Sequence, residues 1–293
     1  MSAGAISHDF LAIDEGRATL LHVNERDPAR NWLVPIGRAE ARDMQLVGGG
    51  RVLVGHAHGY TEFDIEQGRV AKTFNALRGV TSVRRQPDGR TLVAGVDMAG
   101  SQGVVVLELD ADDRELRRTV FGGDYVRLIR QTHHGSYLMC CNDRIREARA
   151  DGTWLRDFTV AGFEHAWKAV PLPDGGLMVT AGYGACVVEL AADGCVRRSF
   201  GSLRQVPTAV RPFFYASFQL LPNGHVVLAN WQGHGLGRGE SGRQLLEFDR
   251  HGEIVWSWSR AELISSLQAV LVLDGLDLSR LHDERDGTMA PLD

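Results

Sequence analysis

The sequence predicts an all-β protein: a six-bladed β-propeller formed by residues 1–293 as a single domain. An apolar strand, a glycine turn and a second apolar strand recur five times, and a second hairpin follows each copy, so each unit is a four-stranded antiparallel blade. Repeats of about 40 to 50 residues are typical of propeller blades. The turn glycines of the five first hairpins are 39, 46, 40 and 49 residues apart: Gly50, Gly89, Gly135, Gly175 and Gly224.

The two ends of the chain together predict the sixth blade. Segment 8–37 carries three strands without an innermost one, and 267–273 is a lone apolar strand near the C-terminus. Joined, they close the ring and remove the open edges that a linear stack of sheets exposes. We expect a short helical turn at 260–266 and an ordered or frayed tail at 274–293. The other five blades are expected at 42–76, 81–121, 126–158, 166–200 and 215–259.

The composition excludes several classes of partner. Lys and Arg number 32 against 37 Asp and Glu, a net charge of -5, so no positive field attracts nucleic acid or an anionic membrane. No apolar run could span a membrane, and the first residues lack the pattern of a signal peptide, so we expect a cytoplasmic protein. The 4 cysteines form no disulfide framework, and we expect reduced thiols. No phosphate loop or Gly-x-Ser-x-Gly elbow occurs, and the cofactor is unknown.

One face of the predicted propeller is richer in functional groups than the other. We label the strands of a blade A to D from the axis outwards. The A–B and C–D turns are minimal glycine turns, whereas the B–C loops and the D–A crossings between blades carry histidines, tyrosines, arginines and tryptophans. Binding residues tend to lie in loops on a rigid scaffold. We therefore expect a polar axial pocket at the B–C and D–A face.

Three residues near the D–A crossings are candidates for catalysis. His165 and Tyr215 lie at the starts of A strands, near the expected channel mouth, where each could act as a general base or acid. The alternative is an inward polar residue that only holds channel water. Arg211 could pair bidentately with a carboxylate, although a salt bridge to Glu164 or Asp124 explains it equally well.

The B–C loops supply candidate ligand-binding residues. Two histidines one residue apart could offer two nitrogens to a metal, but no certain third ligand is present, so we assign no metal site and keep a hydrogen-bonded loop pair as the alternative. The glycine-rich loop 230–242 places a Trp beside a His, which suits stacking on a sugar ring. The alternative is a surface loop packed on its own Trp. The predicted ligand-binding set is His56, His58, Asn142, Tyr183, Trp231 and His234.

Two segments carry a family resemblance. Leu220-Leu-Pro-Asn-Gly-His-Val-Val-Leu-Ala-Asn230 and Leu246-Glu-Phe-Asp-Arg-His-Gly-Glu-Ile-Val-Trp-Ser-Trp258 resemble blades of the pyrroloquinoline-quinone-like and arylsulfotransferase-like propeller superfamily. The resemblance covers most of the chain as a repeat pattern and implies the fold. That superfamily mixes oxidoreductases, sulfotransferases, sugar-acid lyases and scaffolds, so no catalytic residue is carried over.

Together these features favour an enzyme, a carbohydrate-active lyase or hydrolase, whose axial pocket takes a small sugar-derived substrate. If the substrate is a uronate, the natural reaction is removal of the acidic proton beside its carboxylate followed by β-elimination, which is lyase chemistry. Two alternatives stay open. One is a non-catalytic carbohydrate-binding or sensing propeller that uses the same pocket, and the other is a protein-interaction scaffold.

Overall fold

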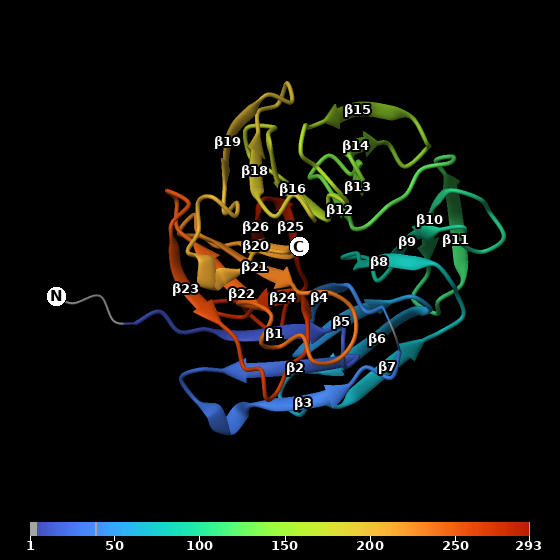
Figure 1. The fold of residues 1–293 in the computed structure, drawn as a ribbon. Helices are drawn as coiled ribbons and strands as arrows, with labels where there is room; N and C mark the ends of the chain where they lie inside the picture. Colours follow the sequence, from blue (N-terminus) through green and yellow to red (C-terminus); the bar gives the residue numbers. More distant parts are fainter. Residues whose placement is uncertain (1–4, 39, 293) are drawn as a thin grey trace.

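The computed structural model describes residues 5–38 and 40–292, and these form a ring of six antiparallel blades around a central axis (Figure 1). Within these ranges, helix is limited to two short 3-10 segments, η1 (Pro28–Arg30) and η2 (Thr208–Val210). The A strands of successive blades contact one another around the axis. The predicted all-β, six-bladed propeller is confirmed.

The two chain ends close the ring in blade 1, as predicted. This blade consists of β24 (Leu267–Val272), β1 (Asp9–Asp14), β2 (Thr19–Asn24) and β3 (Trp32–Pro35) in that order. Strand β24 pairs antiparallel with β1, in the same sheet. Segment 260–266 contains hydrogen-bonded turns and no helix.

Blades 2 to 6 follow in chain order, each with strand A nearest the axis and strand D outermost. Blade 2 consists of β4 (Asp43–Gly48), β5 (Arg51–His56), β6 (Gly59–Asp64) and β7 (Val70–Phe74). Blade 3 consists of β8 (Val80–Arg85), β9 (Thr91–Val96), β10 (Val104–Leu109) and β11 (Glu115–Val120). Blade 4 consists of β12 (Ile129–Gln131), β13 (Tyr137–Cys141), β14 (Arg144–Ala148) and β15 (Trp154–Thr159). Blade 5 consists of β16 (Lys168–Pro171), β17 (Leu177–Thr180), β18 (Val187–Leu190) and β19 (Val196–Phe200). Blade 6 consists of β20 (Phe214–Leu220), β21 (Val226–Trp231), β22 (Leu245–Phe248) and β23 (Ile254–Trp258).

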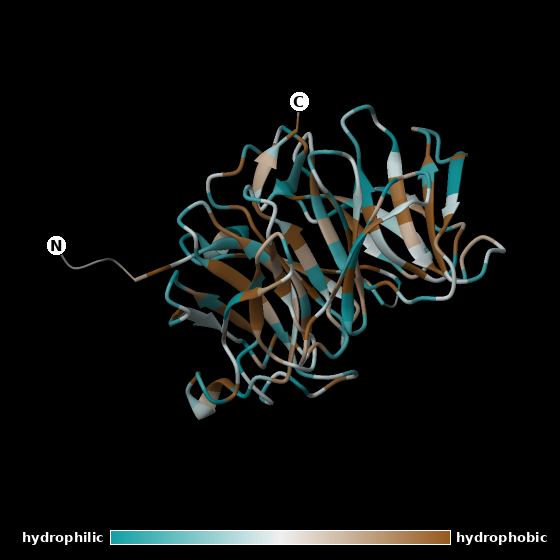
Figure 2. Ribbon diagram, turned by 90° about the horizontal axis from the view of Figure 1, so that it is seen from above, coloured by the Kyte–Doolittle hydropathy of each residue, from teal (hydrophilic) through white to brown (hydrophobic). Residues whose placement is uncertain are grey.

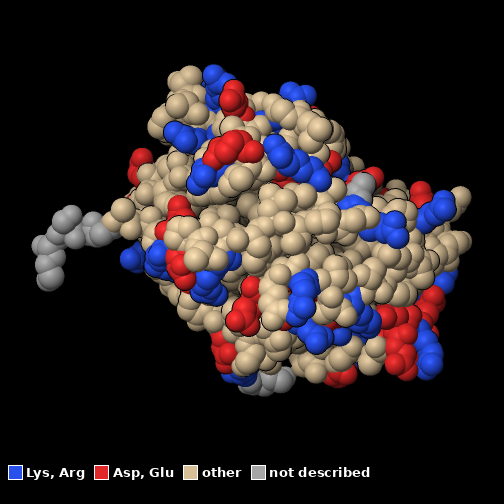
Figure 3. Space-filling model, turned by 90° about the horizontal axis from the view of Figure 1, so that it is seen from below, with Lys and Arg blue, Asp and Glu red and all other residues tan. Residues whose placement is uncertain are grey.

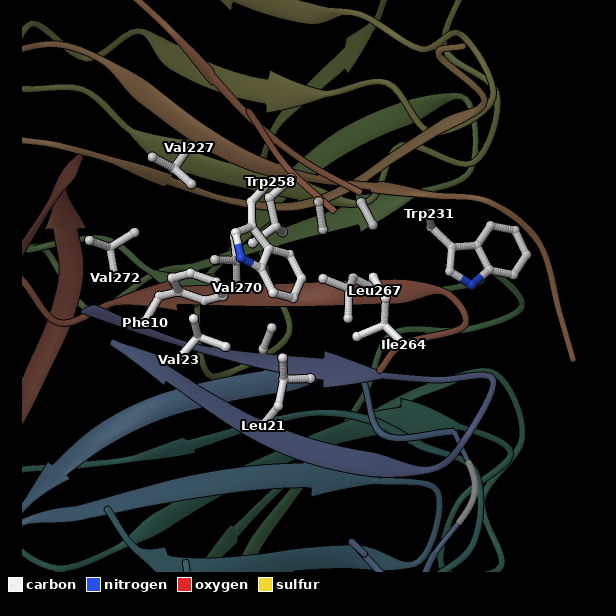
Figure 4. Packing of buried hydrophobic residues seen from close by; sticks show 14 of the residues in the cluster. Phe10, Leu21, Val23, Val227, Trp231, Trp258, Ile264, Leu267, Val270 and Val272 are labelled. Atoms are coloured by element: carbon white, nitrogen blue, oxygen red, sulfur yellow. The ribbon is translucent and has the colours of Figure 1, made fainter. Parts of the chain in front are cut away.

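The core lies between the blades. Strands A to C are buried because each blade is covered on both faces by its neighbours, whereas D strands such as β11 are largely exposed. Figure 2 shows hydrophobic stretches along the strands inside the ring. Between blades 6 and 1, the Phe10 ring meets the Trp258 ring edge-on at 5.3 Å (Figure 4). The Trp256 ring lies 6.0 Å from the Phe10 ring. Both tryptophans therefore pack between blades.

The C-terminal tail forms a hairpin inside the ring. Strands β25 (His282–Asp286) and β26 (Thr288–Pro291) extend the sheet of blade 6 and contact strands of blades 2, 4 and 5 near the centre of the ring (Figure 1). The hairpin enters from the A–B turn side, where Val47 of blade 2 bridges Leu281. Residues 274–292 are therefore ordered, and the hairpin fills the axial channel from one end.

A buried charge network holds this hairpin. Glu284 is 0% exposed, and its carboxylate lies 3.1 Å from Arg84, 2.9 Å from Arg130 and 2.6 Å from Lys168. These three cations come from the A strands of blades 3, 4 and 5. Asp43 and Asp283, also buried, bring the carboxylates to three, so the charges balance inside the channel.

The outer surface carries charges of both signs. On the side drawn in Figure 3, Lys and Arg are interspersed with Asp and Glu. Within the described ranges, no helix is long and apolar enough to cross a membrane.

Candidate functional site

A cavity of about 400 Å³ lies on the face of the B–C loops and D–A crossings, opposite to the side where the hairpin enters. This is the face on which the sequence predicts a site, and the volume is within the range of small-molecule pockets. Its charged lining residues are Glu15, Glu40, Arg42 and Arg127. The remaining lining residues are aromatic or neutral polar: His165, Trp167, Tyr183, Phe214, Trp231, His234 and Gln268.

Arg127 is the cation of this cavity that has no carboxylate partner among the described residues. It precedes the A strand of blade 4. Its Nη1 donates to the Tyr125 hydroxyl at 3.1 Å, and its guanidinium lies 4.5 Å from the Tyr125 ring centre and 5.4 Å from that of Trp167. Burial lowers the pKa of Arg127, because desolvation disfavours the charged form. An anion in the cavity would compensate this charge.

Three residues of the lining hold buried polar atoms without a hydrogen-bond partner among the described residues. These atoms are the Arg127 Nε, the Trp167 indole Nε1 and the Gln268 amide Oε1. Buried polar groups are normally hydrogen-bonded, so each unpaired one calls for an explanation. All three residues line the cavity, but these atoms themselves are buried behind its wall.

His165 is held against Asn142 at the cavity wall. Both residues have left-handed backbones, with φ 61 and φ 29, and the Ala166 N–H donates to the Asn142 carbonyl oxygen at 2.7 Å. The His165 Nδ1 lies 2.8 Å from Asn142 Oδ1 and 3.1 Å from Arg127 Nη2. Burial and the Arg127 charge lower the pKa of His165, against a smaller opposite effect of Glu164. The lowered pKa favours the neutral imidazole, which is the form that can accept a proton.

Glu15 lies in the B–C loop of blade 1, on the part of the lining formed with blade 6. It accepts a hydrogen bond from the Trp231 indole Nε1 at 3.3 Å, and its other oxygen lies 3.0 Å from the His234 Nδ1. The Trp231 and His234 rings meet edge-on at 4.6 Å. Arg42 differs from Arg127, because it already forms an ion pair with Glu40.

The structure brings five of the nine predicted site residues to this cavity. His165, Tyr183, Trp231 and His234 line it, and Asn142 lies behind the lining, within hydrogen-bond distance of His165. The Trp231 ring is 4% exposed and packs edge-on against Phe214. Four predicted residues lie elsewhere: Tyr215, Arg211, His56 and His58.

Tyr215 does not reach the cavity. It is 0% exposed, packs beside Phe248, and donates its hydroxyl hydrogen to the Gly201 carbonyl oxygen at 2.6 Å. The preceding residue, Phe214, lines the cavity instead, since successive side chains of a strand point to opposite faces. Tyr215 is at the expected end of its strand but on the wrong face for the predicted role.

Arg211 lines a separate hollow of about 390 Å³ together with Arg243. Its carbonyl oxygen accepts hydrogen bonds from the side chains of Asn230, at 3.3 Å, and Gln232, at 3.0 Å. The salt bridge offered as its alternative role does not form with Asp124, which pairs with Arg146 at 2.9 Å. The backbone of Arg211, not its guanidinium, is thus what supports the cavity loop.

His56 and His58 form the hydrogen-bonded loop pair that the sequence offers as their alternative role. The His58 N–H donates to His56 Nδ1 at 3.3 Å, and His58 Nδ1 lies 3.2 Å from the Leu77 carbonyl oxygen. Burial lowers the pKa of His56 to about 4. Across the described parts of the chain, no three His, Cys, Asp or Glu side chains are grouped so that they could hold a metal ion.

Seven lining residues are not in the predicted site set: Glu15, Glu40, Arg42, Arg127, Trp167, Phe214 and Gln268. Arg127 precedes an A strand as His165 does, and Glu15 follows a B strand as Tyr183 does. The same positional signal could therefore have found both. Gln268 lies inside a strand expected to be apolar, and only the fold shows that its side chain faces the cavity.

Comparison with known proteins finds structures of similar fold. No family model and no curated protein matches the chain. A solved structure of a protein of unknown function from Bacteroides caccae is 22% identical, with a TM-score of 0.74 over 91% of this chain and 99% of that chain. A streptogramin B lyase is 11% identical, with a TM-score of 0.55 over 89% and 85%.

A third similar structure is a catalytically inactive histidine-to-alanine variant of virginiamycin B lyase from Staphylococcus aureus with quinupristin. It is 10% identical, with a TM-score of 0.57 over 88% of this chain and 86% of that chain. At such identities the likeness shows a shared fold alone. The comparisons thus support a six-bladed β-propeller, and they do not confirm the pyrroloquinoline-quinone-like or arylsulfotransferase-like assignment.

Proposed function

We propose that the cavity binds a small ring-shaped organic acid, a uronate being the class that fits best, and that the protein is a lyase. The observation that carries the proposal is Arg127, a part-buried guanidinium at the cavity with no carboxylate partner among the described residues. Guanidinium pairs with a carboxylate through two parallel hydrogen bonds, so it fixes both position and orientation of such a ligand.

The rest of the lining suits the ring of a sugar acid. The aromatic walls formed by Trp167, Tyr183 and Trp231 offer apolar faces and edges on which a sugar ring can pack. A deep polar cavity of this kind favours a small ligand over the broad apolar patch expected of an interaction scaffold.

His165 is the proposed base. With the carboxylate on Arg127, the neighbouring carbon loses its proton to the imidazole. The C–H bonding pair then forms a carbon–carbon double bond conjugated to the carboxylate. The oxygen substituent on the next carbon leaves with its bonding pair and takes a proton from water at the open mouth. Neutral His165 is the form that this step requires.

Two of the similar propellers are named lyases, and the inactive variant of one replaces a histidine. These names support the proposal because they show that proteins of a similar fold are called lyases. The alternative, a propeller that binds a sugar acid without converting it, uses the same contacts and differs in turnover.

The test compares D-glucuronate with methyl glucoside, a ring of similar size without the charge. Calorimetry should show binding of glucuronate alone, and Arg127→Met should weaken it about tenfold or more, since hydrogen bonds to charged groups contribute roughly 1.5–3 kcal/mol. Arg78→Gln is the matched control, because Arg78 is exposed on the same face and does not line the cavity. Equal binding of both sugars would contradict the proposal.

Turnover is tested with uronate oligosaccharides by the ultraviolet absorbance of the unsaturated product. His165→Ala should abolish the absorbance change while glucuronate still binds. If the parent protein binds glucuronate but converts none of the oligosaccharides, the non-catalytic alternative replaces the lyase.

A further inference from the structure

The Nδ1 atom of His165 has two neighbours that it cannot satisfy together. Asn142 Oδ1 lies at 2.8 Å and Arg127 Nη2 at 3.1 Å. An amide oxygen only accepts hydrogen bonds and a guanidinium only donates them, whereas a neutral imidazole nitrogen either donates or accepts. When Nδ1 accepts from Arg127, the ring proton is on Nε2. When Nδ1 donates to Asn142, the proton is on Nδ1 and Nε2 has a free lone pair.

We infer that a carboxylate bound to Arg127 switches His165 from the first of these tautomers to the second, so that the ligand itself activates the base. The inference rests on the proposed function for the class of ligand, and it deepens that function by making Arg127 the selector of anionic substrates. Asn142 is then a positioning residue, which acts through His165.

The charges favour this order of events. Without a ligand, Arg127 has no carboxylate partner in the described parts of the chain, so its guanidinium is free to donate to Nδ1. A carboxylate is a stronger acceptor for a guanidinium than a neutral imidazole, because the hydrogen bond is charge-assisted. The ligand therefore draws the guanidinium away from Nδ1, and the Asn142 oxygen remains as the partner.

The backbone keeps the ring in place during the switch. His165 and Asn142 both have left-handed φ angles, and the Ala166 N–H bond to the Asn142 carbonyl joins their two loops. The exchange is consequently a matter of protons: Nε2 loses one to water and Nδ1 gains one, and the imidazole stays neutral. No described residue hydrogen-bonds Nε2, so it is available to a ligand.

Specificity follows from the same geometry. A neutral sugar leaves Arg127 on Nδ1, which keeps the proton on Nε2 and denies the ring its function as a base. A sugar acid both binds and completes the base. Discrimination therefore acts on the proton-transfer step as well as on affinity.

The test is nitrogen NMR of the full chain with 15N-labelled histidine, which distinguishes the two tautomers by the shifts of Nδ1 and Nε2. His165→Gln identifies the His165 signals. We expect the Nε2–H tautomer in the free protein, and exchange of the two shifts in Arg127→Met without any ligand. Asn142→Gly should retain the Nε2–H tautomer, and glycine tolerates the positive φ of this position. Arg78→Gln should match the parent.

Addition of D-glucuronate should exchange the two shifts in the parent, whereas methyl glucoside should leave them in place. The Nδ1–H tautomer in the free parent, or the Nε2–H tautomer in Arg127→Met, would overturn the inference. Because the Arg127→Met comparison needs no ligand, it tests the competition for Nδ1 even if glucuronate fails to bind, whereas glucuronate that binds the parent without exchanging the shifts would overturn the switch. If the shifts exchange in Arg127→Met but glucuronate does not bind, the proposed ligand class is wrong and the competition for Nδ1 stands.

Discussion

At the scale of single residues, His8 links three distant parts of the chain. Its Nδ1 lies 2.6 Å from Asp274 and its Nε2 2.9 Å from Glu247. Burial opposes the charge, but the two carboxylates outweigh burial and raise the pKa of His8 to about 9. A folded pKa above the unfolded value of about 6.5 means that protonated His8 stabilises the fold fully below pH 6.5. This contribution, roughly 3 kcal/mol, is lost as the pH rises through about 9.

We therefore predict that His8→Gln lowers the free energy of unfolding strongly at pH 6 and only slightly at pH 10. Urea titrations of both proteins at each pH measure it, and the difference between them removes the effect of other titrating groups. A difference that does not change with pH would contradict the assignment.

Residue scale is also where sequence reasoning was least reliable. The rule that residues at the start of an A strand approach the channel mouth found His165, yet it gave Tyr215 the role of its neighbour Phe214. Strand β20 changes register between Tyr215 and Phe218, so side-chain direction could not be counted along the strand. A sequence pattern places a residue on a face of the fold more securely than it fixes where the side chain points.

At the scale of elements, the hairpin β25–β26 depends on one carboxylate. We predict that Glu284→Gln destabilises the fold by about 3–5 kcal/mol, because it leaves Arg84, Arg130 and Lys168 buried with one compensating charge fewer. Asp286→Asn is the matched control, since Asp286 lies on the same hairpin and is exposed. Urea unfolding at pH 7 measures both, and a Glu284→Gln protein as stable as the control would show that the network does not hold the hairpin.

The sequence predicted the repeated blades, and it did not predict the hairpin β25–β26. Blades recur with apolar strands and glycine turns, so each copy supports the interpretation of the others. The segment His282–Asp286 occurs once and is mostly charged, a composition that indicates an exposed tail. It is buried because its carboxylates pair with cations from three blades. These blades are far apart in the sequence, so the sequence pattern does not show that the charges meet.

At the scale of the whole molecule, the ring is closed by a pairing that no turn connects. Strand β24 meets β1 across nearly the full length of the chain, whereas the other neighbouring strands A to D within each blade are consecutive in the sequence. Closure then depends on packing between blades 6 and 1, where Phe10 and Trp258 lie (Figure 4). Blade 1 should consequently open at a lower free energy than the continuous blades.

We predict that Trp258→Ala selectively exposes this closure. The matched variant is Phe158→Ala, which removes a comparably buried ring, 9% against 7% exposed, between blades 4 and 5. Each should lose about 3–5 kcal/mol of stability, because a cavity replaces a buried aromatic side chain. Hydrogen exchange should then separate them: amides of β1 and β24 lose protection first in Trp258→Ala, whereas in Phe158→Ala they remain as protected as the other inner strands. Equal loss of protection around the ring in both variants would mean that the propeller opens as one cooperative unit and that its closure is no weaker than any blade.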